Sequence, residues 1–202
     1  MPYKPSDYYA RKAKAEDYRA RSVYKLQEIQ QRYPVLAPGS KVLDLGAAPG
    51  SWSQYASQVI GPKGHVLGID LTPIDLKLEN GTFLAGDLNE VGWPDRLAQT
   101  AAPPPYDAVL SDMAPKTTGV RSTDMARSVQ LCEQALWVAQ QVLRSGGHFV
   151  CKMFDNAETN AFRQTLRQHF GEVQIVRPKS TRQVSTEIFF VARRYLQTGP
   201  QP

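Results

Sequence analysis

Lys41-Val-Leu-Asp-Leu-Gly-Ala-Ala-Pro-Gly-Ser-Trp52 is the stretch that decides the fold of this 202-residue chain. Its apolar start predicts a strand, the small residues that follow predict a tight loop, and residues 52–60 predict an amphipathic helix. Because Gly46 and Gly50 lack a Cβ atom, the backbone can turn sharply there and approach a ligand closely. A strand, a glycine loop and a helix in this order form the opening unit of a Rossmann-like fold, where a nucleotide-like ligand lies at the carboxyl end of the strand.

The spacing of these glycines limits what the loop alone can establish. It is G-x-x-x-G, whereas dinucleotide-binding loops have G-x-G-x-x-G. A plain turn between a strand and a helix would have the same spacing. The rest of the chain must therefore decide whether the loop holds a ligand.

Hydrophobic periodicity on either side of this unit predicts an α/β fold. We expect residues 1–20 to be weakly helical or irregular, because they show no sustained apolar stripe. Strands that alternate with helices up to residue 170 predict a mostly parallel sheet with helices on both faces. Only residues 177–184 separate the last two strands, too few for a helical crossover, so the seventh strand should be antiparallel. Besides the opening unit, the expected helices are 22–33, 93–100, 124–143 and 157–170, and the expected strands are 65–69, 82–85, 106–110, 148–153, 173–176 and 186–192.

Length and composition place these elements in one domain. We expect a basic and aromatic segment over residues 1–20, a single folded domain over 21–194 and a disordered tail over 195–202. No apolar run reaches the roughly 18 residues that span a membrane, and the N-terminus lacks the apolar core of a signal peptide, so we expect a cytoplasmic protein. The cysteines, Cys132 and Cys151, and the scattered histidines have no metal-ligand spacing, which predicts no metal site and two buried thiols.

The net charge of +5 is concentrated at the two ends of the sequence. Residues 1–25 and residues 177–194 each carry +4, and the remainder carries −3. If the fold brings the ends together, they form one basic face of the kind that binds a polyanion. Tyrosines interleaved with the N-terminal charges are suited to stacking on unpaired RNA bases, although a solvated basic tail would look similar. These tyrosines are Tyr3, Tyr8, Tyr9, Tyr18 and Tyr24.

The residues that follow the expected strands describe a ligand. Asp44, Asp70, Asp87 and Asp112 end the first four strands and Lys152 ends the fifth, so they should meet at one edge of the sheet. An acid after the second strand can accept both ribose hydroxyls, and one after the third can accept an adenine amino group. These acids would repel a pyrophosphate. They therefore predict an adenosine that carries positive charge, and S-adenosylmethionine, a sulfonium, fits.

A series of motifs from about Arg21 to Arg193 closely resembles the FtsJ-type family, also called RlmE, of RNA 2′-O-ribose methyltransferases. The series in order is Arg21-Ser-Val-Tyr-Lys25-Leu, Asp44-Leu-Gly-Ala-Ala-Pro-Gly-Ser-Trp52-Ser-Gln, Asp70-Leu-Thr-Pro73, Gly86-Asp87, Ser111-Asp112-Met-Ala-Pro115, Val150-Cys-Lys152-Met-Phe154 and Ser185-Thr-Glu187. The family more often has glycine where this chain has Ser51, a residue that can cap the following helix. The resemblance implies the class I methyltransferase variant of the Rossmann-like fold.

The resemblance also implies which residues act. The catalytic tetrad of the family falls on Lys25, Asp112, Lys152 and Glu187, and its cofactor contacts fall on Gly50, Trp52, Asp70, Asp87 and Asp112, next to the close approach expected at Gly46. A ribose 2′-hydroxyl is a poor nucleophile that must lose its proton as it attacks. Lys152 is the candidate to assist, but only as a neutral amine, because an ammonium has no lone pair. The sequence leaves open whether Lys152 takes the proton or only steers the oxygen.

Family members of similar length imply which RNA accepts the methyl group. The resemblance favours a uridine of 23S rRNA in the 50S subunit as the acceptor, with the enzyme acting as a monomer away from membranes, while some relatives modify tRNA. Two other classes of protein stay open on sequence grounds. An NAD-type oxidoreductase shares the opening unit, and a non-catalytic RNA-binding protein would account for the basic ends but not for Asp112, Lys152 and Glu187.

Overall fold

A computed structural model describes residues 5–88, 90 and 92–197 of the chain. Most of the expected elements are present within two or three residues of their expected ends. The elements in chain order are α1 (Pro5–Ala15), α2 (Val23–Arg32), β1 (Lys41–Leu45), α3 (Ser51–Ile60), β2 (His65–Asp70), β3 (Gly81–Ala85), α4 (Trp93–Ala98), β4 (Tyr106–Ser111), α5 (Arg121–Val142), β5 (Leu143–Phe154), α6 (Thr159–His169), β6 (Phe170–Val176) and β7 (Glu187–Tyr195).

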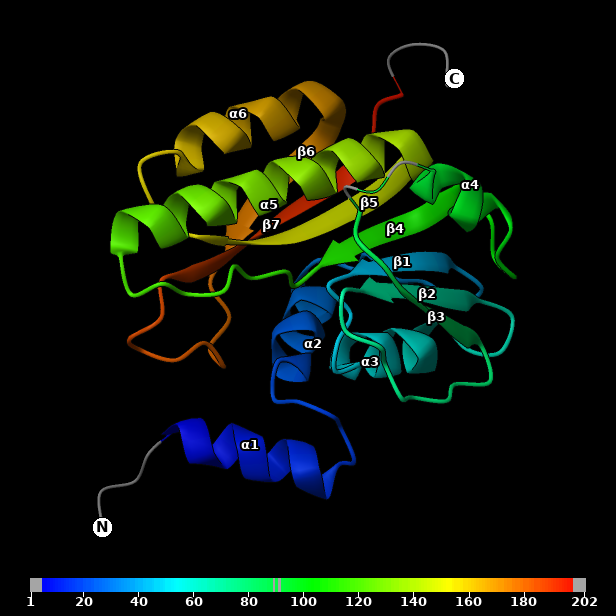
Figure 1. The fold of residues 1–202 in the computed structure, drawn as a ribbon, viewed down its shortest axis with the longest axis horizontal. Helices are drawn as coiled ribbons and strands as arrows, with labels where there is room; N and C mark the ends of the chain where they lie inside the picture. The colour runs from blue at the N-terminus through cyan, green and yellow to red at the C-terminus, as the bar shows by residue number, and fades with distance from the viewer. Residues whose placement is uncertain (1–4, 89, 91, 198–202) are drawn as a thin grey trace.

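The strands form one seven-stranded sheet in the order β3-β2-β1-β4-β5-β7-β6. Strands β1 to β5 pair in parallel, and β7 is antiparallel to both β5 and β6, as predicted. The chain runs outward from β1 to β3 and then returns to place β4 on the other side of β1 (Figure 1). This reversal opens a crevice at the carboxyl ends of β1 and β4, where open α/β sheets bind their ligands.

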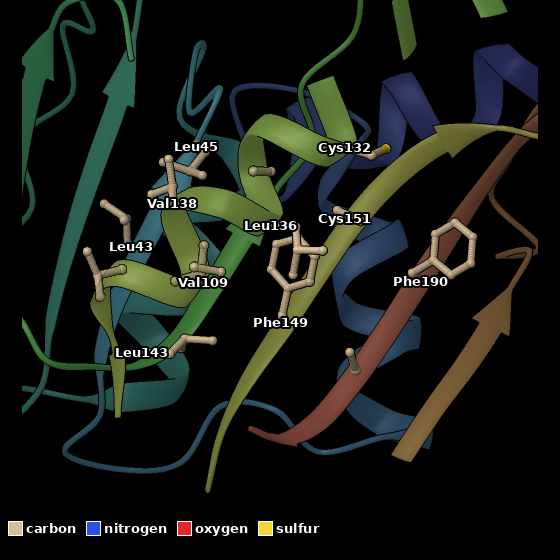
Figure 2. Packing of buried hydrophobic residues seen from close by; sticks show 14 of the residues in the cluster. Leu43, Leu45, Val109, Cys132, Leu136, Val138, Leu143, Phe149, Cys151 and Phe190 are labelled. Carbon is tan, nitrogen blue, oxygen red and sulfur yellow. The ribbon is translucent and has the colours of Figure 1, made fainter. Parts of the chain in front are cut away.

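Helices cover both faces of the sheet, so the core has two layers. Side chains alternate along each strand, which sends Val42 of β1 toward α2 and α3, and Leu43 and Leu45 toward the face covered by α4, α5 and α6. Figure 2 shows the second layer, in which Leu136 of α5 packs near Phe149 of β5. The two buried layers fix the height of every strand end relative to its neighbours.

Three segments differ from the sequence-based expectation. Residues 71–80 join β2 to β3 without a helix, so strands and helices do not alternate strictly. Strand β5 begins at Leu143, directly after α5, because Leu143 is already extended (φ −74°, ψ 139°). Gly146-Gly147, which lies between the expected helix 124–143 and the expected strand 148–153, belongs to an irregularity of β5 where the pairing jumps from Leu143 to His148.

The N-terminal segment is more ordered than expected. Residues 5–15 form a regular helix, α1, and the connection to α2 lies across α3. There the Tyr18 hydroxyl donates to Gln58 (2.8 Å), and Gln54 bonds the backbone of both Asp17 and Arg19. Most of the tail expected over residues 195–202 lies outside the described residues, and Tyr195 belongs to β7.

Candidate active site

The loop after β1 adopts a conformation that requires its two glycines. Gly46 has φ 73° and Gly50 has φ 111°, both in the left-handed region that side chains disfavour. A Cβ atom on Gly46 would lie 2.5 Å from Cγ of Met113, and one on Gly50 would lie 2.6 Å from Cδ2 of Leu76. The side chains of Met113 and Leu76 therefore pack directly on the main chain of the loop, at positions where only glycine fits.

Asp70 ends β2 and holds this loop in place. Its Oδ2 atom accepts a hydrogen bond from the Ala48 backbone N–H (3.0 Å), and its Oδ1 atom accepts one from the Thr72 N–H (2.8 Å). The carboxylate is half-buried at the carboxyl edge of the sheet. It keeps free lone pairs beyond these two bonds, because each carboxylate oxygen accepts about two.

Two further predicted cofactor contacts, Asp87 and Trp52, come from the end of β3 and from α3, and a third, Asp112, follows β4. Asp87, shortly after β3, is half-buried and lines a small hollow with Leu84 and Trp93. The Trp52 side chain is 2% exposed, and its Nε1–H donates to the Ser22 carbonyl (2.9 Å). Since that side chain is packed between α2 and α3, only the backbone of Trp52, in the first turn of α3, is placed to meet a ligand.

Asp44 differs from the other strand-end acids, because its carboxylate is fully buried instead of lying at the edge. Ser53 of α3 donates a hydrogen bond to Oδ2 (2.6 Å), while Oδ1 has no partner among the described residues. Burial first, and then the nearby charges of Asp112 and Asp70, raise the pKa of Asp44 to about 7 against the lowering effect of Ser53. The residue anchors α3 to β1 beneath the glycine loop.

We expect Asp44 to make stability fall with rising pH. Between its ordinary pKa of 3.8 and the raised value of about 7, the folded protein keeps a proton that the unfolded chain releases, so stabilisation is lost as pH rises. The unfolding free energy of the wild type relative to Asp44→Asn should therefore fall by roughly 2 kcal/mol between about pH 5 and about pH 8. Urea titrations of both proteins measure the difference. A difference that does not change with pH would contradict the assignment.

The four residues of the predicted tetrad form two ion pairs that lie together. Lys25 Nζ lies 2.7 Å from Glu187 Oε2, and Lys152 Nζ lies 2.8 Å from Asp112 Oδ1. Lys152 also donates to the Asp112 backbone carbonyl (2.6 Å). The side chains are 6–19% exposed. All four side chains are therefore largely buried, the lysines more than the acids.

The strand register explains why these residues meet. On β5 and β7 Lys152 pairs with Phe189, and Glu187 lies two residues from Phe189, which places Lys152 and Glu187 on the same sheet face. Such diagonal neighbours lie about 7–8 Å apart at the backbone, within reach of long side chains. Asp112 directly follows β4, whose last residue pairs with the neighbour of Lys152. Helix α2 then supplies Lys25 from that face, 5.6 Å from the Phe189 ring.

The two pairs interact electrostatically. Burial disfavours the charge of Glu187, but the Lys25 ammonium outweighs burial, and with help from Lys152 it lowers the pKa of Glu187. Glu187 is therefore ionised at neutral pH. The site combines two carboxyl groups and two lysine amines at the crevice, an arrangement that can orient a hydroxyl group and move or stabilise its proton.

The basic ends of the sequence meet only in part. Arg21 donates from Nη2 to the Ser180 carbonyl (2.9 Å), which joins the start of α2 to the loop between β6 and β7 beside Glu187. Arg193 and Arg194 are instead at the other end of β7, opposite the start of β5, and both pair with Glu172. The expected single basic face does not include them, because an antiparallel strand carries its two ends to opposite edges of the sheet.

Most of the described N-terminal tyrosines pack against each other instead of lying free for stacking on RNA bases. Tyr9 and Tyr18 contact the ring of Tyr24, which is buried and donates to Glu16. Tyr8 is 46% exposed and remains available for stacking, whereas Tyr3 lies outside the described residues. The cluster therefore ties α1 to α2 and leaves one described aromatic ring on the surface.

The structure also describes the cysteines, the metal-type side chains and a groove away from the tetrad. Both cysteines are buried and free, and Cys132 donates from Sγ to the Lys152 carbonyl (2.9 Å). In the described ranges no three metal-type side chains gather, and no helix is long and apolar enough to cross a membrane. A groove of about 340 Å³ between α5 and α6 has Trp137 and Phe162 in its walls and contains none of the predicted site residues.

Several residues that shape the site received no role from the sequence, although two of them, Ser53 and Met113, lie within the quoted motifs. Ser53 supports Asp44, Met113 and Leu76 close over the two glycines, and Ser128 of α5 accepts from the Phe154 N–H just after Lys152 (2.9 Å). Their residue types are common, and only the packing of distant segments brings them to the crevice. No spacing rule identifies such contacts.

Comparison with known proteins places these features in a family context. The family described as FtsJ-like methyltransferase matches residues 18–195. A protein of Bdellovibrio bacteriovorus named ribosomal RNA large subunit methyltransferase E is 52% identical over 191 residues, 95% of this chain and 97% of the relative. A protein of the same name from Syntrophobacter fumaroxidans is 46% identical, over 96% of this chain and 98% of its own. A crystal structure of a ribosomal RNA methyltransferase from Plasmodium falciparum superposes with a TM-score of 0.76 at 27% identity, over 89% of this chain and 99% of that one.

Proposed function

Because the chain belongs to the FtsJ-like methyltransferase family, we propose that it methylates the 2′-hydroxyl of a ribose in large-subunit ribosomal RNA. The observation that carries the proposal is the cluster of two ion pairs, Lys25 with Glu187 and Lys152 with Asp112, at the crevice beside the glycine loop. Relatives named ribosomal RNA large subunit methyltransferase E supply the acceptor class.

The residues around the glycine loop fit S-adenosylmethionine, the methyl donor of this family. Gly46 and Gly50 give the loop the left-handed turns that it needs at the carboxyl end of β1, and no lysine or arginine of a phosphate cradle stands in the loop. In this proposal Asp70 accepts from the ribose hydroxyls and Asp87 from the adenine amino group, with the Trp52 backbone N–H at the start of α3. When bound, the cofactor supplies an electrophilic methyl group on a sulfonium centre.

The tetrad then prepares the nucleophile. Asp112 fixes Lys152 Nζ through both its carboxylate and its backbone carbonyl, so the amine has one position from which to meet the ribose hydroxyl. In its neutral form, Lys152 would accept the proton of the ribose hydroxyl and so make its oxygen a better nucleophile. Glu187, held ionised by Lys25, accepts a hydrogen bond from the hydroxyl or from Lys152 and keeps the oxygen aligned.

The surface around the crevice is consistent with an RNA acceptor. Arg11 and Lys14 of α1 are exposed, and Lys179 and Arg182 extend from the loop before β7. These cations contribute a salt-dependent attraction to phosphates that does not depend on base identity. Lys12 and Arg19 contribute less, because Lys12 lies near Glu16 (3.7 Å) and Arg19 donates to the Asp75 carbonyl.

The proposal also names the target nucleotide, the form of the enzyme and its domain bounds. A uridine of 23S rRNA in the 50S subunit is the proposed target, and a monomer in the cytoplasm is the proposed form, with residues 21–194 as the methyltransferase domain and residues 1–20 as a basic extension. A tRNA ribose is the alternative acceptor, since the tetrad acts on a ribose and not on a particular base.

Methyl transfer from labelled S-adenosylmethionine to undermethylated tRNA, 23S rRNA and 50S subunits tests the function directly. We expect label in rRNA or in subunits, at a nucleotide whose 2′-O-methyl group blocks alkaline cleavage. Label in tRNA alone would keep the chemistry and change the acceptor. An enzyme that binds the cofactor and labels none of these RNAs would be the RNA-binding alternative, and the proposal would fail.

A further inference from the structure

The loop over residues 177–186, between β6 and β7, is fixed to α2 and its N-terminal edge. Arg21 donates to the Ser180 carbonyl (2.9 Å), and the Lys179 backbone N–H donates to Glu28 of α2 (2.7 Å). These contacts join segments more than 150 residues apart in sequence. The base of the loop is therefore held by the same helix that carries Lys25.

The second half of the loop is closed by its own hydrogen bonds. Arg177 donates from Nη2 to the Ser185 carbonyl (2.5 Å), and the Ser185 N–H donates to the Arg182 carbonyl (3.0 Å). The Ser185 hydroxyl accepts from the Glu187 N–H (3.2 Å), which links the turn directly to the tetrad. The tip, Arg182 to Val184, is thus presented by a fixed frame.

An apolar side chain stands at this tip without any cover. Val184 is 92% exposed, three residues before Glu187, and its neighbours Arg182 and Gln183 are exposed too. A single exposed valine is ordinary on a protein surface. Val184, however, lies in a basic loop close to Glu187 in sequence, and hydrogen bonds hold that loop at both ends. This position distinguishes it from an ordinary exposed valine.

Two arginines of this region, Arg21 at the base of the loop and Arg182 at its tip, influence each other electrostatically. Burial and the adjacent Arg182 charge both lower the pKa of Arg21, although Glu187 opposes them. Like charges that lie so close repel each other, and an anion between or above them relieves the repulsion. On an enzyme that acts on RNA, the anion is a phosphate of the chain that passes the crevice.

We propose that the tip of this loop holds the unpaired nucleotide that adjoins the target ribose, with Arg182 on its phosphate and Val184 against the face of its base. The inference rests on the proposed function and adds a substrate requirement, namely that the adjoining base must be unstacked. Every base offers an apolar face, so the contact sets local geometry without reading sequence. Together, the phosphate and base contacts position the 2′-hydroxyl of the neighbouring ribose over the tetrad.

Val184→Asn tests the contact without adding charge. Binding of a fluorescent oligouridine should weaken about fivefold, because an amide replaces the methyl groups that cover the base. For wild-type acceptor RNA, KM should rise by a similar factor while kcat, affinity for S-adenosylmethionine and the melting temperature stay unchanged. Val184→Ile, which keeps an apolar side chain, should restore binding. Leu196→Asn, at an exposed leucine just after β7 on the opposite edge, is the matched control.

The outcomes separate this inference from the proposed function. Equal oligouridine binding by Val184→Asn, Leu196→Asn and the wild type would overturn the inference while methylation by the wild type stands. A fall in kcat at constant KM would also overturn it, since Val184 would then act by placing Glu187. Failure of the wild type to methylate any RNA would refute the proposed function, and weaker oligouridine binding by Val184→Asn alone would still support the contact.

Discussion

Lys152→Ala is expected to lower kcat for RNA methylation by about a thousandfold or more, the scale of lost proton-transfer assistance at a positioned group. The Lys152 amine is nearly buried and lies within 2.8 Å of two oxygen atoms of Asp112, so its loss removes a positioned group from the site. Affinity for S-adenosylmethionine should change little, because the substitution leaves the expected cofactor contacts, among them Asp70 and Asp112, in the protein. Single-turnover methyl transfer and calorimetric titration measure the two quantities.

Lys152→Arg separates the two roles that Lys152 can have. A guanidinium stays protonated at any pH used for assay, so it can steer an oxygen lone pair but cannot accept a proton. Activity as low as in Lys152→Ala would identify proton acceptance as the role, whereas partial activity would favour steering. Lys116→Ala removes an exposed lysine from the loop after Asp112 and is the control. Near-normal turnover of Lys152→Ala would end the assignment of Lys152.

The fold and the composition of the site were predictable because strand ends obey simple geometry. Short apolar runs marked β1, β2 and β4, and parallel strands in one sheet must bring their carboxyl ends to one edge. Asp70, Asp112 and Lys152 were therefore expected to be neighbours before any contact was known. The antiparallel pairing of β7 followed from the length of one loop, and the structure confirms it.

The pairings within the site were not predictable from spacing. Which lysine meets which acid depends on the tilt of α2 and on the β5–β7 register, and these follow from the packing of whole layers. Trp52 shows the same limit, because a tryptophan beside a glycine loop suits a ligand or a core equally well, and only the Ser22 contact decides. Asp44 looked like an edge acid, yet Ser53 holds it inside.

The second large effect is expected at Asp70, where Asp70→Asn should weaken binding of S-adenosylmethionine by on the order of a hundredfold. The carboxylate accepts backbone N–H groups from two different loops, one on each oxygen. An asparagine has one acceptor oxygen, so its amide NH₂ would face either the Ala48 or the Thr72 N–H, donor against donor. The loop would shift, and the acceptor proposed for the ribose hydroxyls would lose its charge.

Asp75→Asn is the matched control for this change. Asp75 is an exposed acid in the same connection between β2 and β3, and its described contact is through its backbone carbonyl, which accepts from Arg19. Isothermal titration of the three proteins should give equal affinities for the wild type and Asp75→Asn. Thermal unfolding of Asp70→Asn should remain cooperative, because the residue lies at the rim and outside both core layers. If Asp70→Asn bound the cofactor as tightly as Asp75→Asn, Asp70 would not be a cofactor ligand, and the ribose would have to lie elsewhere along the carboxyl edge.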